Sequence, residues 1–107
     1  MAHAAEVGQH DLPAVHPVGN VQQVLGALAD PVRLEMVRRL AERKEPTACS
    51  MLYEGINKST ASHHFKILRE AGLTEPSIVG GKTHQRLRFA EVEEALPGVL
   101  SAVVDAL

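Results

Sequence analysis

The sequence predicts a mainly α-helical domain that carries one small β-hairpin, and three observations support this prediction. Aliphatic side chains dominate the apolar residues, since the 107-residue chain has two Phe, one Tyr and no Trp. Apolar residues recur at helical spacing over most of the chain, between residue types that cap and break helices. The pattern alternates only around Gly80-Gly81, as is typical of two short strands joined by a tight turn.

The length and composition indicate a single domain. A chain of 107 residues with 45% hydrophobic content can build one ordinary core but not two. One cysteine leaves no intrachain disulfide. The sequence shows no apolar run long enough to span a membrane and no secretory leader, so we expect a cytoplasmic protein.

Charge is distributed unevenly along the chain. The net charge of -2 argues by itself against a nucleic-acid-binding protein. Residues 56–89, however, hold six Lys or Arg and two Glu, a net +4, whereas the rest of the chain carries -6. A basic segment in an acidic body can bind phosphate if its bases share one surface; the alternative is an ordinary solvated surface.

Residues 1–18 show no sustained periodicity, and we expect a flexible N-terminal arm followed by a domain over residues 19–107. His3, His10 and His16 lie in this arm without a close i, i+4 pair. A solvated tail is therefore favoured over a metal site.

Two helices follow the arm. Asn20 is a suitable N-cap for the first of them. Asp30-Pro31 ends that helix and starts a second over about residues 31–43, because Asp caps well and Pro fits the first helical position. The arginines of the second helix are expected in surface ion pairs rather than on DNA. The apolar stripe of the first helix comprises Val21, Val24, Leu25 and Leu28.

Two further helices are separated by a short turn that contains glycine. Thr47 can cap a short third helix that ends at Gly55, and Asn57 can cap a fourth helix that ends at Gly72. This spacing is that of a helix-turn-helix, whose second helix reads DNA.

The two faces of the fourth helix differ chemically. One side carries a core stripe of Ala61, Phe65 and Leu68, with His64 packed beside it or flanking it. The other side is polar and mostly able to donate hydrogen bonds to base edges or phosphate. The predicted DNA contacts on this helix are Lys58, Ser59, Thr60, Ser62, His63 and Lys66.

Residues 77–79 and 85–89 are predicted to form a hairpin around residues 80–83. Leu87 and Phe89 share one face, and Arg86 and Arg88 share the other. Such a hairpin can act as a wing on the DNA backbone or in the minor groove; the alternative is a capping hairpin with solvated arginines. The predicted wing contacts are Lys82, Thr83, His84 and Arg86.

The last part of the chain repeats apolar residues at helical spacing across Pro97-Gly98. Pro97 either kinks this helix or restarts it. A stripe this apolar needs another surface to pack against. We expect it to pack both on the first helix of the same chain and on the same surface of a second copy. The expected homodimer interface comprises Val21, Val24, Leu25, Leu28, Leu96, Val99, Leu100, Val103 and Val104.

The order of elements is that of a dimeric winged helix-turn-helix, with about five helices plus a two-stranded β-hairpin wing, and the local sequence narrows it to a family. Residues 28–34, Leu-Ala-Asp-Pro-Val-Arg-Leu, and residues 59–73, Ser-Thr-Ala-Ser-His-His-Phe-Lys-Ile-Leu-Arg-Glu-Ala-Gly-Leu, resemble the ArsR/SmtB family of bacterial repressors. The resemblance covers about residues 21–107. It implies a homodimer, paired through its first and last helices, that leaves double-stranded operator DNA when an inducer binds. Recognition helices one DNA turn (~34 Å) apart would read an imperfect palindrome.

The sequence departs from the metal-sensing members of this family. One of their sites uses closely spaced cysteines on the third helix, where this chain has Cys49 alone; another uses Asp and His on the last helix, which here has no His. We therefore predict no metal site and no cofactor, and no inducer is indicated. Cys49 could sense oxidants, but a small buried core group is favoured.

The sequence disfavours two other classes of function. A winged helix can be a protein-interaction module, but such a module would carry apolar anchors on the exposed face of the recognition helix, which here is polar. An enzyme is less favoured still, because no Ser/His/Asp or glycine-rich phosphate motif stands out and His63 and His64 diverge on a helix.

Overall fold

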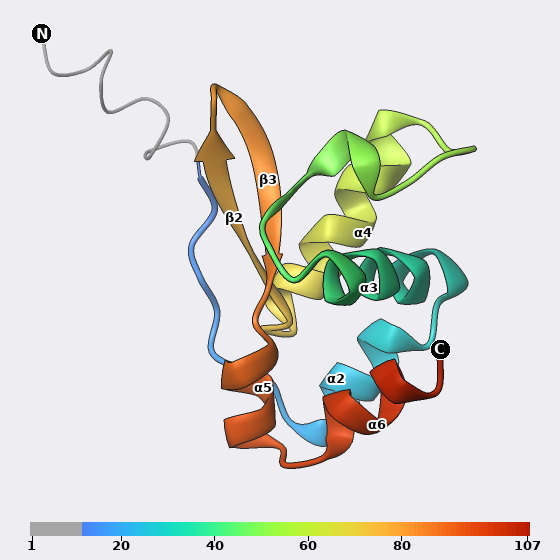
Figure 1. The fold of residues 1–107 in the computed structure, drawn as a ribbon, viewed down its shortest axis with the longest axis vertical. Helices are drawn as coiled ribbons and strands as arrows, with labels where there is room; N and C mark the ends of the chain where they lie inside the picture. The colour runs from blue at the N-terminus through green and yellow to red at the C-terminus, as the bar shows by residue number, and fades with distance from the viewer. Residues whose placement is uncertain (1–11) are drawn as a thin grey trace, which may run out of the picture.

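A computed structural model describes residues 12–107, in which helices gather around one end of a small sheet while a hairpin projects alongside them (Figure 1). This arrangement confirms the predicted winged helix-turn-helix. The α-helices are α2 (Val21–Leu28), α3 (Pro31–Arg43), α4 (Lys58–Glu70), α5 (Phe89–Ala95) and α6 (Val99–Asp105). The strands are β1 (Thr47–Ala48), β2 (Thr74–Val79) and β3 (Lys82–Leu87), and a 3-10 helix η1 spans Cys49–Met51.

Three of the four predicted N-caps are confirmed. Asn20 Oδ1 accepts a hydrogen bond from the Gln23 amide, and Asn57 Oδ1 accepts one from the Thr60 amide, each at 2.8 Å. Asp30 Oδ1 accepts from the Val32 amide at 2.8 Å and from the next amide along the chain. Each cap satisfies a backbone donor that has no partner inside its helix.

Gly72 ends α4 in the left-handed conformation, with φ of 79°. The Leu73 amide donates to the Leu68 carbonyl at 3.0 Å, a hydrogen bond typical of the Schellman ending of a helix. A Cβ at position 72 would also lie 2.4 Å from the Pro17 carbonyl oxygen. Only glycine therefore fits both the backbone angle and the close approach of the N-terminal segment.

The predicted third helix is wrong. Thr47 is 3% exposed and pairs with Gln85 across an antiparallel ladder, so β1 adds a third strand in the order β1-β3-β2. Only the 3-10 helix η1 follows. The open edge of β3 offers backbone partners to this segment, and the β-branched Thr47 fits a half-buried strand better than a helix start.

The hairpin is longer than predicted, and its boundary with the last helix differs. Both strands span six residues, and Phe89 opens α5 instead of ending β3. Pro76 lies in β2, an edge strand that tolerates its missing donor. Pro97 separates two helices, so the chain restarts rather than kinks.

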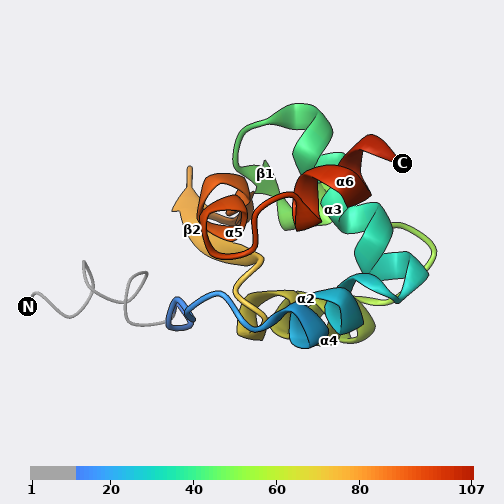
Figure 2. The same ribbon diagram turned by 90° about the horizontal axis from the view of Figure 1, so that it is seen from below.

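Glu93 stabilises the start of α6, the second of these two helices. Its carboxylate accepts from the Ser101 amide and hydroxyl, both at 3.0 Å, and from the Gly98 amide at 3.2 Å. Seen from below, α2 runs beside α4 whereas α6 lies against α3 (Figure 2). The C-terminal helices thus close the end of the domain opposite the hairpin tip.

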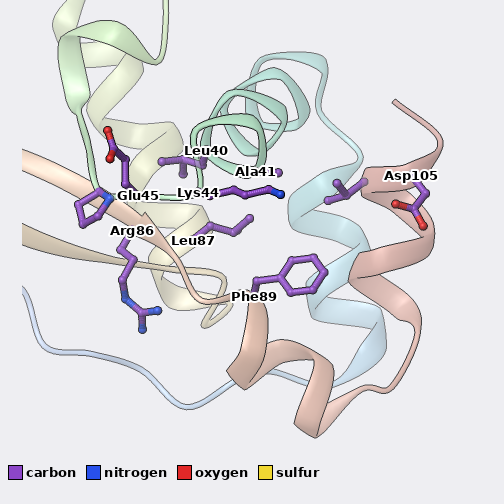
Figure 3. A pocket seen from close by; sticks show the side chains of 10 residues that line it. Leu40, Ala41, Lys44, Glu45, Arg86, Leu87, Phe89 and Asp105 are labelled. Carbon is purple, nitrogen blue, oxygen red and sulfur yellow. The ribbon is translucent and has the colours of Figure 1, made fainter.

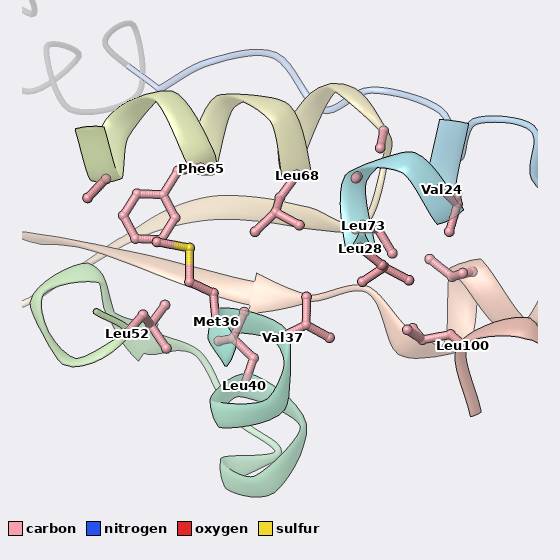
Figure 4. Close-up of a cluster of buried hydrophobic side chains, with 14 residues drawn as sticks. Val24, Leu28, Met36, Val37, Leu40, Leu52, Phe65, Leu68, Leu73 and Leu100 are labelled. Carbon is pink, nitrogen blue, oxygen red and sulfur yellow. The ribbon is translucent and has the colours of Figure 1, made fainter. Parts of the chain in front are cut away.

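The core lies between α4, α3, α2 and the sheet (Figure 4). The predicted stripe of α4 is buried, with Ala61 1%, Phe65 8% and Leu68 0% exposed. Val24 and Leu100 are also 0% exposed and Leu28 is 5% exposed. Their assignment to the dimer interface is therefore corrected, because these three side chains fill the core of their own chain.

Candidate DNA-binding interface

The polar face of α4 is available to a partner. Leu52, which is fully buried, anchors the turn before α4, and Gly55 gives that turn a φ of 77°. Tyr53 meets Phe65 edge to face, with ring centroids 6.1 Å apart. These contacts orient α4 with its predicted DNA contacts outward. All six are exposed: Lys58, Ser59, Thr60, Ser62, His63 and Lys66.

The structure brings part of this face together with the wing. Lys58 and Ser62 of α4 line a groove of about 240 Å³ together with Thr83 of β3. Arg69 lines the same groove, and its Nε has no hydrogen-bond partner within residues 12–107. The sequence did not single out Arg69 as a site residue, although its position three turns after Lys58 places it on that side of the helix.

His64 lies on the opposite side of α4 from the solvent, as predicted. It is 9% exposed, and its Nδ1 lies 3.0 Å from Arg33 Nη1 and 3.9 Å from Asp30 Oδ1. Because guanidinium only donates, Nδ1 accepts this hydrogen bond. Arg33 Nε also donates to the Ala27 carbonyl at 2.7 Å. Arg33, expected in a surface ion pair, instead ties α4 to the junction of α2 and α3.

The tip of the wing carries two of the predicted contacts in solvent. Gly80 and Gly81 adopt φ of 58° and 79°, which the tight turn requires. Lys82 and Thr83 are exposed just after this turn. His84 is half-buried, and its Nδ1 lies 3.1 Å from the Lys82 carbonyl oxygen.

Arg86 occupies a different environment from the other wing residues. Its Nη2 donates to Glu75 Oε1 at 2.6 Å and also to Glu91 Oε2. The hydrogen bonds that Arg86 donates to Glu91 and Glu75 raise the pKa of Arg86, and Arg86 lowers the pKa of Glu91. Two carboxylates at the base of the wing already pair with Arg86, so the predicted contact of this residue with DNA would compete with two ion pairs.

Arg88 holds the chain that precedes α2. Its Nη1 donates to the His16 carbonyl at 2.6 Å and to the Gly72 carbonyl at 3.0 Å. Residues 12–18 form neither helix nor strand, yet this part of the predicted arm is bound to the domain. Residues 1–11, with His3 and His10, lie outside the described residues.

Cys49 is half-buried beside Gln85, whose Nε2 donates to Sγ at 3.6 Å. Burial raises the pKa of the Cys49 thiol, which disfavours the reactive thiolate. Across residues 12–107, no group of three or more His, Cys, Asp or Glu is placed to hold a metal ion. In the same part of the chain, no helix is long and apolar enough to cross a membrane.

The exposed polar helix, the glycine turn before it and the basic-tipped hairpin beside it define a winged helix-turn-helix domain. The helix-turn-helix domain family matches residues 28–76. The chain is 37% identical over 83 residues to YceK of Bacillus subtilis (strain 168), described as an uncharacterized HTH-type transcriptional regulator. The match covers 76% of this chain and 83% of YceK.

Two solved structures share the fold. One is the homodimeric winged helix-turn-helix DNA-binding domain of Mb0332 from Mycobacterium bovis, which is described as a possible ArsR-family transcriptional regulator. It superimposes with a TM-score of 0.62 at 25% identity, and the match covers 97% of this chain and 85% of that one. The transcriptional repressor BigR from Xylella fastidiosa has a TM-score of 0.58 at 23% identity, covering 95% of each chain. The chain belongs to the ArsR/SmtB family of winged helix-turn-helix transcriptional regulators. This is a family of regulators and not of enzymes.

Proposed function

We propose that this protein is a homodimeric repressor that binds an imperfect palindrome in double-stranded DNA. The observation that carries the proposal is the joint position of α4 and the wing. The N-terminal half of α4 and the hairpin tip lie at the same end of the molecule (Figure 1), and Lys58, Ser62 and Thr83 line one groove. A duplex laid against this end meets both elements at once.

The two elements have different roles in this proposal. Ser59, Ser62 and His63 enter the major groove and read base edges. Lys82, Thr83 and His84 hold the backbone from the wing, and Arg69 is an added candidate for phosphate. Arg86 has no part in binding. Within residues 12–107 the lysines of this surface form no ion pair, so their charge is free for phosphate: Lys58, Lys66 and Lys82.

We also propose that this protein lacks the usual metal sites of the family. Cys49 has no second thiol near it in sequence. On α5 and α6, Glu91 is held by Arg86 and Glu93 caps α6. Two of the acidic groups on these helices therefore already have structural partners, and no His accompanies them.

Repression rather than activation is supported by the fold shared with BigR, which is described as a transcriptional repressor. A reporter placed behind the selected operator is expected to rise in output when the gene for this protein is removed. A fall in output would contradict repression.

The binding roles are tested by fluorescence anisotropy, with an operator selected from random DNA and a scrambled duplex of equal length. Ser62→Ala and His63→Ala are expected to weaken operator binding more than scrambled binding, by ~1–3 kcal/mol for each base contact. Lys82→Ala is expected to weaken both duplexes alike and to lower the salt slope by about one.

Arg86→Ala serves as the matched control, because its charge is already neutralised. It is expected to leave the salt slope unchanged, with circular dichroism confirming the fold. Equal loss on both duplexes for the α4 variants would contradict their assignment to base reading. Absence of any sequence preference in the selection would favour a protein-interaction module.

A further inference from the structure

A second pocket lies away from the DNA-binding interface, where the C-terminal end of α3 meets the end of β3 and the helices that follow it (Figure 3). Its volume is about 530 Å³, within the range of sites for small organic ligands. The apolar part of its lining comprises Leu40, Ala41, Leu87, Phe89 and Val104.

Apart from Leu40, which is 2% exposed, the chain's own side chains leave this apolar lining partly uncovered. Phe89 is 39% exposed. Leu87 and Val104 remain half-buried. An uncovered phenyl ring and two aliphatic side chains that converge on a hollow favour an apolar guest there.

Lys44 provides a charge at the mouth of this pocket. It is the one non-glycine residue with positive φ among residues 12–107, with φ of 59° and ψ of 25°. Glycine is preferred at such helix ends, so the sequence keeps a lysine at a small cost in conformational energy. Its side chain extends over the same hollow that Leu87 and Phe89 line (Figure 3).

The other charged groups of the lining do not neutralise Lys44. Arg86 points away from the apolar wall and is held by Glu75 and Glu91. The Glu45 carboxylate also points away, and Asp105 lies at the far end (Figure 3). Within the described chain Lys44 has no carboxylate within ion-pair distance.

We propose that this pocket binds a small amphipathic molecule with an apolar body and an anionic head group such as a carboxylate. The body lies against Leu40, Leu87 and Phe89, and the head group accepts hydrogen bonds from the Lys44 ammonium. The site also fits an effector of DNA binding, because β3 continues into the wing and α3 packs on α4; this regulatory part rests on the proposed function.

The test is isothermal titration calorimetry of the full chain without DNA, using octanoate, octan-1-ol and octylamine as probes. The three share one alkyl chain and differ in the charge of the head group. Octanoate is expected to bind most tightly and octylamine least. Equal affinity for all three probes, or no binding of octanoate, would overturn the proposal.

The variant Lys44→Gly tests the role of the lysine charge separately from the stability of the fold. Glycine relieves the left-handed backbone, so the variant is expected to melt at a higher temperature while octanoate affinity falls by ~10-fold or more. Arg43→Gln removes a neighbouring exposed charge outside the pocket and is expected to change neither. Unchanged octanoate binding in Lys44→Gly would overturn the assigned role of the lysine.

Ala41→Phe fills the apolar side of the pocket and is expected to abolish binding of octanoate and octan-1-ol alike. If that variant instead changes only the monomer–dimer equilibrium in sedimentation, a second copy covers the pocket and the proposal fails. Octanoate is also expected to shift operator affinity. Binding of octanoate to a protein that never binds DNA would leave the ligand site standing and would refute the proposed function instead.

Discussion

His63 and His64 are adjacent in sequence but occupy opposite environments in the folded chain. His63 is exposed on the polar face of α4, whereas His64 is 9% exposed and accepts a hydrogen bond from Arg33. The 100° step of a helix separates the two side chains. One histidine is thus free for DNA while the other fixes the helix that presents it.

His64→Ala is expected to destabilise the domain, because the partly buried Arg33 loses an acceptor and the ring leaves a gap. The cost of an unpaired buried donor is ~1–3 kcal/mol. Urea unfolding of the variant measures it. His63→Ala is the matched control and is expected to stay within ~0.5 kcal/mol of the parent. Equal stabilities of the two variants would show that the contact with Arg33 contributes nothing.

The role of a single residue was predictable where its hydrogen-bond partners lie close to it in the sequence. Asn20 and Asn57 cap helices through amides three residues away, so the residue type and position were enough. The ion pairs of Arg86 were missed because its partners Glu75 and Glu91 lie 11 and five residues away on different elements. The alternating pattern of the strand shows which face Arg86 occupies but not which elements pack there.

At the scale of elements, helices were predicted more reliably than the sheet. A helix such as α4 is determined by its own periodicity and caps, whereas β1 exists only because β3 offers an edge to pair with, and the paired residues Thr47 and Gln85 lie far apart in the sequence. Two residues, Thr47–Ala48, are too few to show a period of two. The interpretation of Thr47 as a cap was chemically reasonable, yet its hydroxyl donates to the Glu45 carbonyl at 3.1 Å.

The surface of α3 carries a charge network that makes a pH-dependent prediction. Hydrogen bonds from Arg38 and Arg39 lower the pKa of Glu35 from 4.5 to about 2. A carboxyl whose pKa is lower in the folded state stabilises the fold above its unfolded pKa and loses this effect as the pH falls. Glu35 therefore contributes above about pH 4.5, and its contribution disappears toward pH 2.

Glu35→Gln is expected to remove this contribution, so that stability falls less steeply between pH 4.5 and 2 than in the parent. The side chain is 39% exposed, and solvent screening limits the difference to ~0.2–1 kcal/mol. Urea unfolding at several pH values measures it. Glu42→Gln, which alters a 73% exposed side chain at 3.4 Å from Arg38, is expected to keep the parental slope. If stability falls as steeply with pH in Glu35→Gln as in the parent, the ion pairs of Glu35 with Arg38 and Arg39 do not contribute to acid stability.

At the scale of the whole molecule, the wide apolar stripes of the terminal helices divide into a buried part and an exposed part. Val24, Leu28 and Leu100 pack inside the chain, whereas Val21 and Leu25 are 45% and 46% exposed on the outer side of α2. Periodicity predicted the full stripe but not its division, because the side of α2 that meets the core depends on how α2 packs against α3 and α4. The exposed part of the stripe is the surface that the proposed dimer would use.

Leu25→Asp is expected to separate the proposed dimer, because a carboxylate would be buried against an apolar partner without a counter-charge. Such a group costs ~3 kcal/mol or more, which weakens self-association on the order of 100-fold. Sedimentation equilibrium measures this change, and DNA binding should fall to the affinity of one half-site. Met51→Asp places the same charge on a 47% exposed side chain of η1 and is expected to leave the dimer intact. If both variants remain dimeric with full operator affinity, the dimer does not use α2, and its interface must be sought on another face of the molecule.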